Sequence, residues 1–341
     1  MTTKDEEQYS RRGLVAGIGA GVGAVAVTHY GCAAAASGSH ATSSNATAAP
    51  LQDPATKYPA PPFQEQSQPW PALASQMTPR PDHGENSYRG SGRLLGRKAL
   101  ITGGDSGMGR AAAIAFAREG ADVAINYLPA EEPDAAEVIK LIQAEKRVGA
   151  PIPGDLREEA FCQRLVERAV QKLGGLDIIV SNAGRQQTHA SILDLTTADF
   201  DWTMKTNLYA PFWIIKAAVP HLPRGSTIIA TASEQAYDPS PDLYDYAQTK
   251  AATMNFVKSL AKQLASRGIR VNGVAPGPIW TALQVSGGAT QEKLKNFGST
   301  TPLRRPGQPA ELASIYVQLA ASDASFATGQ IYGSSGGGGQ P

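Results

Sequence analysis

The fold is decided by the stretch Leu100-Ile101-Thr102-Gly103-Gly104-Asp105-Ser106-Gly107-Met108-Gly109-Arg110. In this stretch an apolar run leads into clustered glycines, and an alanine-rich segment with helical spacing follows. Gly103 allows a tight turn, Gly107 lets the backbone approach a diphosphate, and Gly109 permits close packing of a helix on a sheet. The helix start offers free N–H groups and a positive dipole to the anion. The stretch predicts the strand, turn and helix of a dinucleotide-binding unit, with Asp105 interpreted as a helix cap.

From residue 98 onward, short apolar runs alternate with segments of helical periodicity. The runs are 99–102, 123–127, 150–153, 178–181, 227–231, 270–274 and 330–332, and the clearest helical segments are 110–119, 158–172 and 251–266. Strands that alternate with helices pair in parallel. Residues 98–341 are therefore predicted to form one α/β domain with a doubly wound parallel sheet, the Rossmann fold.

Composition excludes several classes of function. Lys+Arg 31 and Asp+Glu 30 give the 341 residues a net charge of +1, which provides no overall field for a nucleic acid partner. The two cysteines, Cys32 and Cys162, exclude a disulfide framework and a cysteine-based zinc site. The chain contains no HExxH or P-loop motif either. No metal site is predicted.

Residues 1–36 are predicted to be an export signal rather than part of the fold. Arg11-Arg12 precede an uncharged run at 13–27 and a small-residue zone at 32–36. The sequence Ser10-Arg11-Arg12-Gly13-Leu14 resembles the twin-arginine signal. This predicts a periplasmic or other extracytoplasmic location, with the membrane contacted only through the signal. The alternatives are a lipoprotein signal at Gly31-Cys32 and a flexible or membrane-tethered tail on a cytoplasmic protein.

Two further segments precede the domain. Residues 37–69 consist largely of Ser, Ala, Thr, Pro and Gln without periodicity, and are predicted to be a disordered linker. Residues 70–97 are also rich in Pro and Gly, but they contain the larger apolar residues Trp70, Met77, Tyr88, Leu94 and Leu95. They are predicted to form an extended arm that packs on the domain without a core of its own, or contacts a neighbouring subunit.

Several motifs resemble those of the short-chain dehydrogenase/reductase family, and they follow one another in order along 98–341. The first is Thr-Gly-x-x-x-Gly-x-Gly at 102–109, and the second is Ser181-Asn182-Ala183-Gly184, in which Ser replaces the family's first Asn. The segments 79–96 and 126–129 are similar to a bacterial aldehyde-reductase and stress-oxidoreductase subgroup that carries an arm before its first strand.

The resemblance implies a set of contacts to a nicotinamide cofactor, NADP or NAD. Asp155 would contact the adenine, and Pro276-Gly277 with Thr281 would bound the nicotinamide. The complete implied set is Gly103, Ser106, Gly107, Met108, Gly109, Asn126, Asp155, Leu156, Asn182, Ala183, Gly184, Lys250, Pro276, Gly277, Ile279 and Thr281.

A catalytic set accompanies these contacts. Tyr246 and Lys250 are spaced to share one face of a helix, and Ser233 follows an apolar run at the sheet edge where ligands bind. Tyr246 would be the general acid or base, and nearby positive charge would lower the pKa of its phenol. Ser233 would polarise the carbonyl oxygen, Lys250 would also hold the nicotinamide ribose, and Asn207 would keep a water in a proton relay.

The choice between NAD and NADP is left open by the residues, with NADP favoured. Asn126 stands where an acidic residue would select NAD. Glu131 and Glu132 would oppose a 2′-phosphate if they faced it, whereas Arg110 or Lys98 would attract it.

These observations predict an NAD(P)-dependent oxidoreductase that converts an aldehyde or ketone to an alcohol, or the reverse. One alternative is an exported enzyme with a tightly retained cofactor that couples two substrates, and another is a non-catalytic dinucleotide-binding regulator. Residues 278–303 are predicted to face the substrate as a mobile lid over a mostly apolar pocket containing Ile279, Trp280, Leu283 and Phe297. The family resemblance also implies a homotetramer.

Overall fold

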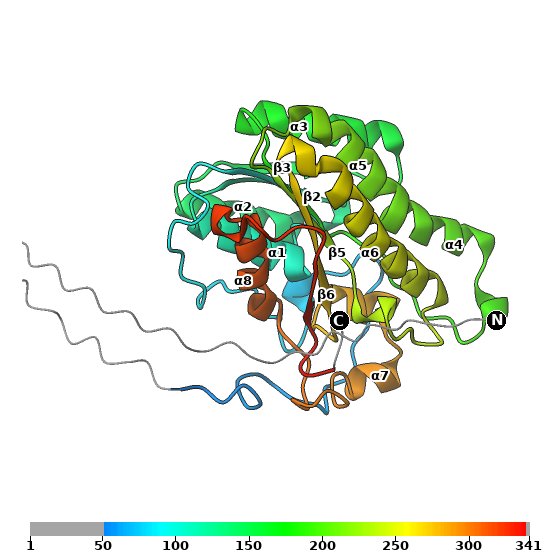
Figure 1. Ribbon diagram of the computed structural model, residues 1–341. Helices are drawn as coiled ribbons and strands as arrows, with labels where there is room; N and C mark the ends of the chain where they lie inside the picture. The colour runs from blue at the N-terminus through cyan, green and yellow to red at the C-terminus, as the bar shows by residue number, and fades with distance from the viewer. Residues whose placement is uncertain (1–50, 339–341) are drawn as a thin grey trace, which may run out of the picture. The chain divides into compact units, whose positions relative to one another are not determined.

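A seven-stranded parallel sheet forms the centre of the computed structural model, which describes residues 51–338 (Figure 1). The strand order is β3-β2-β1-β4-β5-β6-β7, so the order reverses between β1 and β4. The strands are β1 Lys98–Thr102, β2 Asp122–Tyr127, β3 Gly149–Pro153, β4 Ile178–Ser181, β5 Thr227–Thr231, β6 Arg270–Pro276 and β7 Ile331–Ser334. Open parallel sheets bind ligands beside such a reversal, at the carboxyl ends of the strands.

Helices cover both faces of the sheet. They are α1 Gly107–Arg118, α2 Glu132–Ala144, α3 Glu159–Leu173, α4 Thr197–Met204, α5 Ala210–Ala218, α6 Tyr244–Leu264, α7 Gln291–Lys295 and α8 Pro309–Ala320. The helices α1, α2 and α8 pack on one face, while α3, α5 and α6 pack on the other (Figure 1).

Side-chain alternation along the strands explains the two cores. In β1, Ile101 belongs to the core under α1, whereas its neighbour Leu100 belongs to the core under α3. Successive side chains of a strand point to opposite faces, so a strand covered on both sides is apolar throughout. The predicted doubly wound α/β fold is confirmed.

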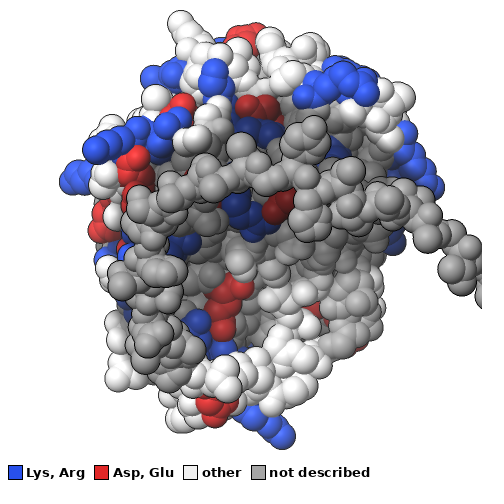
Figure 2. Space-filling view, turned by 60° about the vertical axis from the view of Figure 1, so that its left-hand side comes forward, with Lys and Arg blue, Asp and Glu red and all other residues white. Residues whose placement is uncertain are grey.

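Charged side chains are distributed without a dominant sign on the face shown in Figure 2, where blue and red groups are interspersed. Among the helices within 51–338, none combines the length and the apolar character of a membrane span. Residues 1–36, predicted to be an export signal, lie outside the described residues.

The linker predicted at 37–69 differs from the structure over its described part, 51–69. Phe63 is buried and stacks on Trp280 with 4.3 Å between ring centroids. The Phe63 N–H also donates to the carbonyl of Lys295 at 2.9 Å. The two aromatic residues of this part, Tyr58 and Phe63, stand among Pro, Ala and Gln without periodicity, so the pattern does not predict that the segment packs.

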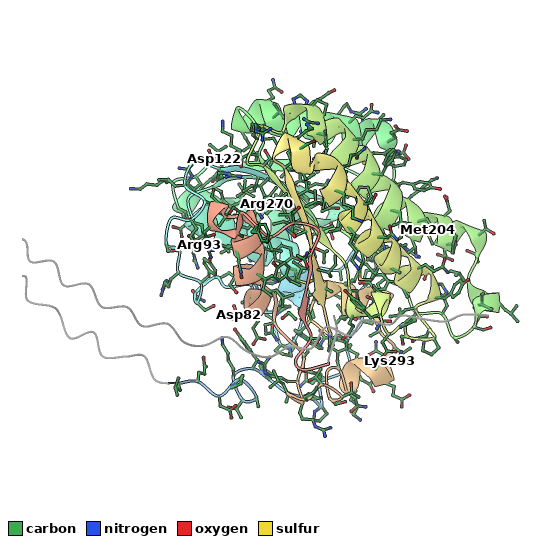
Figure 3. The ribbon with its side chains drawn as sticks, viewed as in Figure 1. Asp82, Arg93, Asp122, Met204, Arg270 and Lys293 are labelled. Carbon is green, nitrogen blue, oxygen red and sulfur yellow. The ribbon has the colours of Figure 1, made fainter. Side chains whose placement is uncertain are left out.

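The arm, residues 70–97, follows the surface of the domain with one short helical turn at Ala74–Gln76. Leu94 enters the core under α1. Asp82 and Arg93 lie beside α8 (Figure 3), and Arg93 pairs with Asp323 at 3.0 Å. Ala74 and Met77 of the arm pack with Trp280 of the domain in a small apolar cluster.

The Phe63–Trp280 stack predicts a clear effect on stability. The substitution Phe63→Ala should lower the free energy of unfolding by about 3 kcal/mol, because it removes a buried aromatic ring and leaves a cavity. Urea unfolding measures the loss. Phe326→Ala is the matched control, because the Phe326 side chain is fully exposed and its removal should leave stability unchanged. Equal losses in the two variants would contradict the packing of Phe63.

Candidate active site

Backbone geometry at the glycine turn creates an opening at the start of α1. Gly103 and Gly107 adopt φ angles of +61° and +52°, which favour glycine. A Cβ added to Gly103 would lie 3.0 Å from the Cα of Ala183, and one added to Gly109 would lie 1.9 Å from the Gly103 carbonyl oxygen. Ser106 precedes the helix without a side-chain cap bond, so the first N–H groups of α1 keep donor capacity for an anion. This cradle fits a diphosphate.

Asn182 holds the neighbouring strand ends together. Its backbone N–H donates to Thr102 Oγ1 at 3.0 Å, and its side-chain amide donates to the Gly103 carbonyl at 3.3 Å. Its Oδ1 accepts a hydrogen bond from Thr231 Oγ1 at 3.2 Å. Three strands, β1, β4 and β5, are thereby joined at their carboxyl ends.

Two adjoining cavities lie along this edge of the sheet. The first has a volume of ≈ 320 Å³, and the predicted cofactor contacts that line it are Gly103, Ser106, Gly107, Met108, Asn126, Asp155, Leu156, Asn182, Ala183, Gly184 and Thr281. The second has a volume of ≈ 520 Å³ and is lined by Ser233, Tyr246, Pro276, Gly277 and Ile279 among others. Both share Met108, Thr281 and Leu283, so they form one continuous cleft.

Three predicted site residues line neither cavity. Gly109 packs against the Gly103 carbonyl instead. Asn207 and Lys250 lie behind Gly184, because a Cβ added there would be 3.6 Å from Asn207 Oδ1 and 3.7 Å from Lys250 Nζ. Both polar atoms therefore lie just behind the part of the first cavity's wall that Gly184 forms.

Tyr246 and Ser233 line the second cavity, and Lys250 lies close behind the tyrosine. Lys250 lies one turn after Tyr246 on α6, with Nζ 5.3 Å from the centre of the tyrosine ring. The ammonium donates to the Thr231 carbonyl at 2.7 Å, which anchors it at the end of β5. All three side chains are buried.

Burial shifts the pKa values of Tyr246 and Lys250 in opposite directions. It raises the pKa of Tyr246 to about 12, although the Ser233 hydroxyl acts to lower it. Burial also lowers the pKa of Lys250 to about 8. Low polarity disfavours the charged form of each group, so near neutral pH the phenol holds its proton and most of the lysine remains cationic.

Asn207 occupies a π-helical turn, Lys205–Tyr209, that joins α4 to α5. Its Oδ1 accepts from the Arg185 N–H at 2.8 Å, and its Nδ2 donates to the Arg185 carbonyl at 2.9 Å and to Thr249 Oγ1 at 3.0 Å. Both amide donors are therefore engaged with the protein, while Oδ1 retains acceptor capacity on the side of Gly184 and Lys250.

The basic residues considered for a 2′-phosphate do not line the cleft. Arg110 is buried and pairs with Glu85 and Glu137, because it lies on the side of α1 that faces the arm. Lys98 is at the opposite end of β1, where Nζ donates to the Gly174 carbonyl at 2.7 Å.

The acidic residues near the end of β2 have different environments. Glu132 accepts a hydrogen bond from the Tyr127 hydroxyl at 2.6 Å and does not line the cavity. Glu131 and Asp105 do line it, and burial raises the pKa of both carboxyl groups. The charge of Asp105 adds to the rise at Glu131, and the charge of Asp134 adds to the rise at Asp105. Asp105 is thus a buried member of the cavity wall, which differs from the helix cap expected from the sequence.

Glu234 was not predicted from the sequence but lines the second cavity beside Ser233. Burial raises the pKa of its carboxyl group to about 7, and Asp238 adds to the shift. Because Glu234 immediately follows Ser233 in the sequence, its position could have indicated that it lies near the site.

The segment 278–303 borders the second cavity as expected, except at Trp280. Ile279, Leu283 and Phe297 line the second cavity, but Trp280 is buried among arm residues. The Trp280 indole N–H donates to the Pro79 carbonyl at 2.8 Å, so the arm holds this segment.

The chain is similar to known oxidoreductases over most of its length. A family model described as enoyl-(acyl carrier protein) reductase matches residues 103–338. An uncharacterized oxidoreductase from Escherichia coli is 55% identical over 84% of this chain and 98% of its own. A chloroplastic NADPH-dependent aldehyde reductase from Arabidopsis thaliana is 40% identical over 78% of this chain and 94% of its own. The crystal structure of a short-chain dehydrogenase from Burkholderia cenocepacia in complex with NADP is 34% identical, with a TM-score of 0.68, and covers 72% of this chain and 98% of its own.

The raised pKa of Glu131 predicts a pH-dependent stability. The folded state favours the protonated form of this carboxyl group. Its contribution to the free energy of unfolding is therefore complete below the unfolded pKa near 4.5, and it is lost as the pH rises towards the folded pKa. Glu131→Gln cannot ionise and should therefore be more stable than the wild type at about pH 8, by on the order of 1–2 kcal/mol, but equally stable at about pH 4.5. Urea unfolding at both pH values measures the difference. Glu132→Gln, at the exposed neighbour, should show no comparable gain.

Proposed function

This chain belongs to the short-chain dehydrogenase/reductase family, and from that premise we propose that it reduces an aldehyde or ketone to an alcohol with NADPH, or catalyses the reverse. The observation that carries the proposal is the position of the Tyr246 phenol, which lies with Ser233 in a cavity continuous with the glycine cradle. Support for NADP(H) comes from the NADP complex and the NADPH-dependent aldehyde reductase to which the chain is similar.

The bound nicotinamide would supply the hydride to the carbonyl carbon. Tyr246 would donate its proton to the carbonyl oxygen as negative charge develops there, and Ser233 would orient the same oxygen through its hydroxyl. Lys250 would stabilise the phenolate that remains and hold the ribose hydroxyls. Asn207 is a positioning residue, because it shapes the chain at Arg185 and presents Oδ1 towards the lysine.

The glycine cradle would hold the diphosphate, and the cavity wall at the end of β2 would hold the adenosine ribose. Glu131 lies in that wall, where burial favours its protonated form. A protonated carboxyl group can donate to a phosphate oxygen, whereas a carboxylate would repel it. We propose that protonation of this wall makes NADPH acceptable, because neither Arg110 nor Lys98 lines the cavity and the arginine that does line it, Arg157, is paired with Asp155.

A second candidate function is favoured by the motif Ser10-Arg11-Arg12, which lies outside the described residues. We propose that the protein is exported in the folded state and carries a retained cofactor on which alcohol oxidation and carbonyl reduction alternate. Purified protein would then release nicotinamide only on denaturation, and Arg11→Lys with Arg12→Lys would abolish its extracytoplasmic location. Protein that emerges from purification without cofactor would count against this candidate.

A homotetramer also remains a proposal for this chain. Tyr209 and Phe212 expose about half of their surface beside and on α5, which is consistent with contact to another copy. Sedimentation velocity tests the assembly.

The central prediction concerns Tyr246. Tyr246→Phe should reduce carbonyl turnover by at least about a hundredfold, because the ring remains but the proton donor is lost. Oxidation of NADPH or NADH is followed by absorbance with a panel of small aldehydes and ketones, while fluorescence titration checks cofactor binding. Tyr244→Phe is the matched control on the exposed start of α6 and should retain activity. Undiminished turnover by Tyr246→Phe would refute the assigned role.

The proposed role of Glu131 predicts how cofactor preference depends on pH. Between about pH 6.5 and about pH 9 the affinity of the wild type for NADPH should fall about tenfold more than its affinity for NADH, because ionised Glu131 repels the 2′-phosphate. Glu131→Gln should abolish this difference. Fluorescence titration with each cofactor measures it, and an identical pH dependence in wild type and variant would exclude contact with the phosphate.

A further inference from the structure

The arm supplies part of the wall of the first cavity. Trp70, Pro71 and Ala72 line the same ≈ 320 Å³ cavity as the glycine cradle and the adenosine side of the cleft. These three residues lie before the first strand and outside every motif that indicates cofactor binding. A dinucleotide held by the cradle would therefore meet the arm on its outer side.

Side-chain and backbone bonds close residues 68–73 into a loop with Trp70 at its tip. The Gln68 side-chain amide donates to the Leu73 carbonyl at 3.1 Å, and Gln68 Oε1 accepts from the Leu73 N–H at 2.9 Å. The Gln68 backbone N–H donates to the Val285 carbonyl at 3.0 Å. The loop is thus fastened to the segment that also lines the second cavity.

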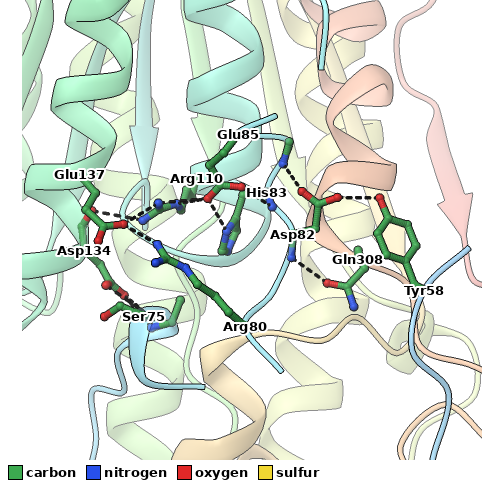
Figure 4. A network of polar contacts seen from close by, with 12 residues as sticks. Tyr58, Ser75, Arg80, Asp82, His83, Glu85, Arg110, Asp134, Glu137 and Gln308 are labelled. Carbon is green, nitrogen blue, oxygen red and sulfur yellow. Dashed lines mark hydrogen bonds and ion pairs between the residues drawn. The ribbon is translucent and has the colours of Figure 1, made fainter. Parts of the chain in front are cut away.

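The downstream side of the loop is fastened to α2. The Ala74 N–H donates to Asp134 Oδ2 at 2.6 Å, and the Ser75 N–H lies 3.4 Å from each of the two carboxylate oxygens. Asp134 is fully buried, and Figure 4 shows its carboxylate directed towards Ser75. A buried carboxylate bonded in this way is costly to detach.

Further along the arm, a network of ion pairs and hydrogen bonds holds it against α1, α2 and α8 (Figure 4). Arg110 on α1 pairs with Glu85 of the arm at 3.1 Å and with Glu137 of α2 at 2.9 Å. The arm's Asp82 accepts from the Tyr58 hydroxyl at 2.7 Å and donates through its backbone N–H to Gln308 at 3.0 Å. The wall at 70–72 therefore lies between two anchored segments.

Trp70 separates two spaces. Together with Trp202, it lines both the first cavity and a neighbouring open cavity of ≈ 410 Å³ that Arg185 also borders. Trp70 and Trp202 therefore form the boundary that the two cavities share. The ring is thus the part of the arm that closes the cleft on this side.

We propose that Trp70, Pro71 and Ala72 are cofactor-binding residues, and that this anchored wall encloses a bound dinucleotide and slows its release. The inference rests on the proposed function, because the ligand it requires is NADP(H). Dissociation from a closed site requires the wall or its anchors to move, so the effect belongs mainly to the dissociation rate. The arm would then belong to the cofactor-binding site and would not serve only to cover the domain.

The test measures NADPH dissociation by stopped-flow fluorescence, with the full-length protein loaded with NADPH and chased by excess NADP⁺. Trp70→Ala should raise the dissociation rate at least about tenfold, while Trp70→Phe, which keeps an aromatic face, should raise it much less. Gln68→Ala should also accelerate release, by a few fold, because it opens the loop without removing the ring. Trp213→Ala, at a half-buried tryptophan on α5 that borders neither cleft cavity, is the matched control and should leave the rate unchanged.

Circular dichroism and thermal unfolding establish that each variant is folded. If Trp70→Ala does not fold, the NADPH dissociation rate of Gln68→Ala tests the proposal. Wild-type dissociation rates in both Trp70→Ala and Gln68→Ala, with NADPH still bound at equilibrium, would overturn the assignment of the arm and leave the proposed function intact. Failure of the wild type to bind either nicotinamide cofactor would overturn the proposed function and this inference together.

Discussion

The close approach of α1 to the end of β1 is the constraint on which the rest of the structure depends. A side chain at position 109 would overlap the Gly103 carbonyl, so the helix can begin beside the sheet reversal only because glycine stands there. This approach directs the N-terminus of α1 into the cleft and places Met108 and Thr281 where the two cavities meet. The same edge receives Asn182, whose bonds join β1, β4 and β5.

Burial then determines the chemistry of the cleft. Tyr246 and Lys250 are removed from water on one face of α6, and the loss of solvation favours the neutral form of each. The phenol is thereby kept as a proton donor near neutral pH, with a lysine beside it that remains mainly cationic. The same effect favours protonated Glu131 and Asp105 at the other end of the cleft, where a dinucleotide would place its adenosine ribose.

Contacts with the arm direct two side chains away from the cleft, although both lie beside motifs of the site. Arg110 follows the glycine turn directly, yet its guanidinium holds Glu85 of the arm rather than facing the cleft. Trp280 follows the segment that bounds the second cavity, yet its indole N–H donates to the Pro79 carbonyl of the arm. These contacts combine the arm, α1 and the substrate-side segment into one packed body, so the walls of the cleft include residues from three distant parts of the chain.

Alternating strands and helices and the spacing of the glycines are local properties, so the sequence alone predicted the doubly wound sheet and the glycine cradle. Helical spacing placed Tyr246 and Lys250 on one face of a helix, whereas their grouping with Ser233 followed from the family resemblance. Only the tertiary structure decided that Glu131 lines the cavity and Glu132 does not, that Arg110 and Lys98 face away, and that the arm forms a wall at Trp70. Which side of a helix faces a cleft, and which distant segment covers it, depends on packing between parts of the chain that carry no signal of each other. The direction of a side chain at the end of a helix or strand therefore depends on how the core is packed, and the neighbouring residues in the sequence do not determine it.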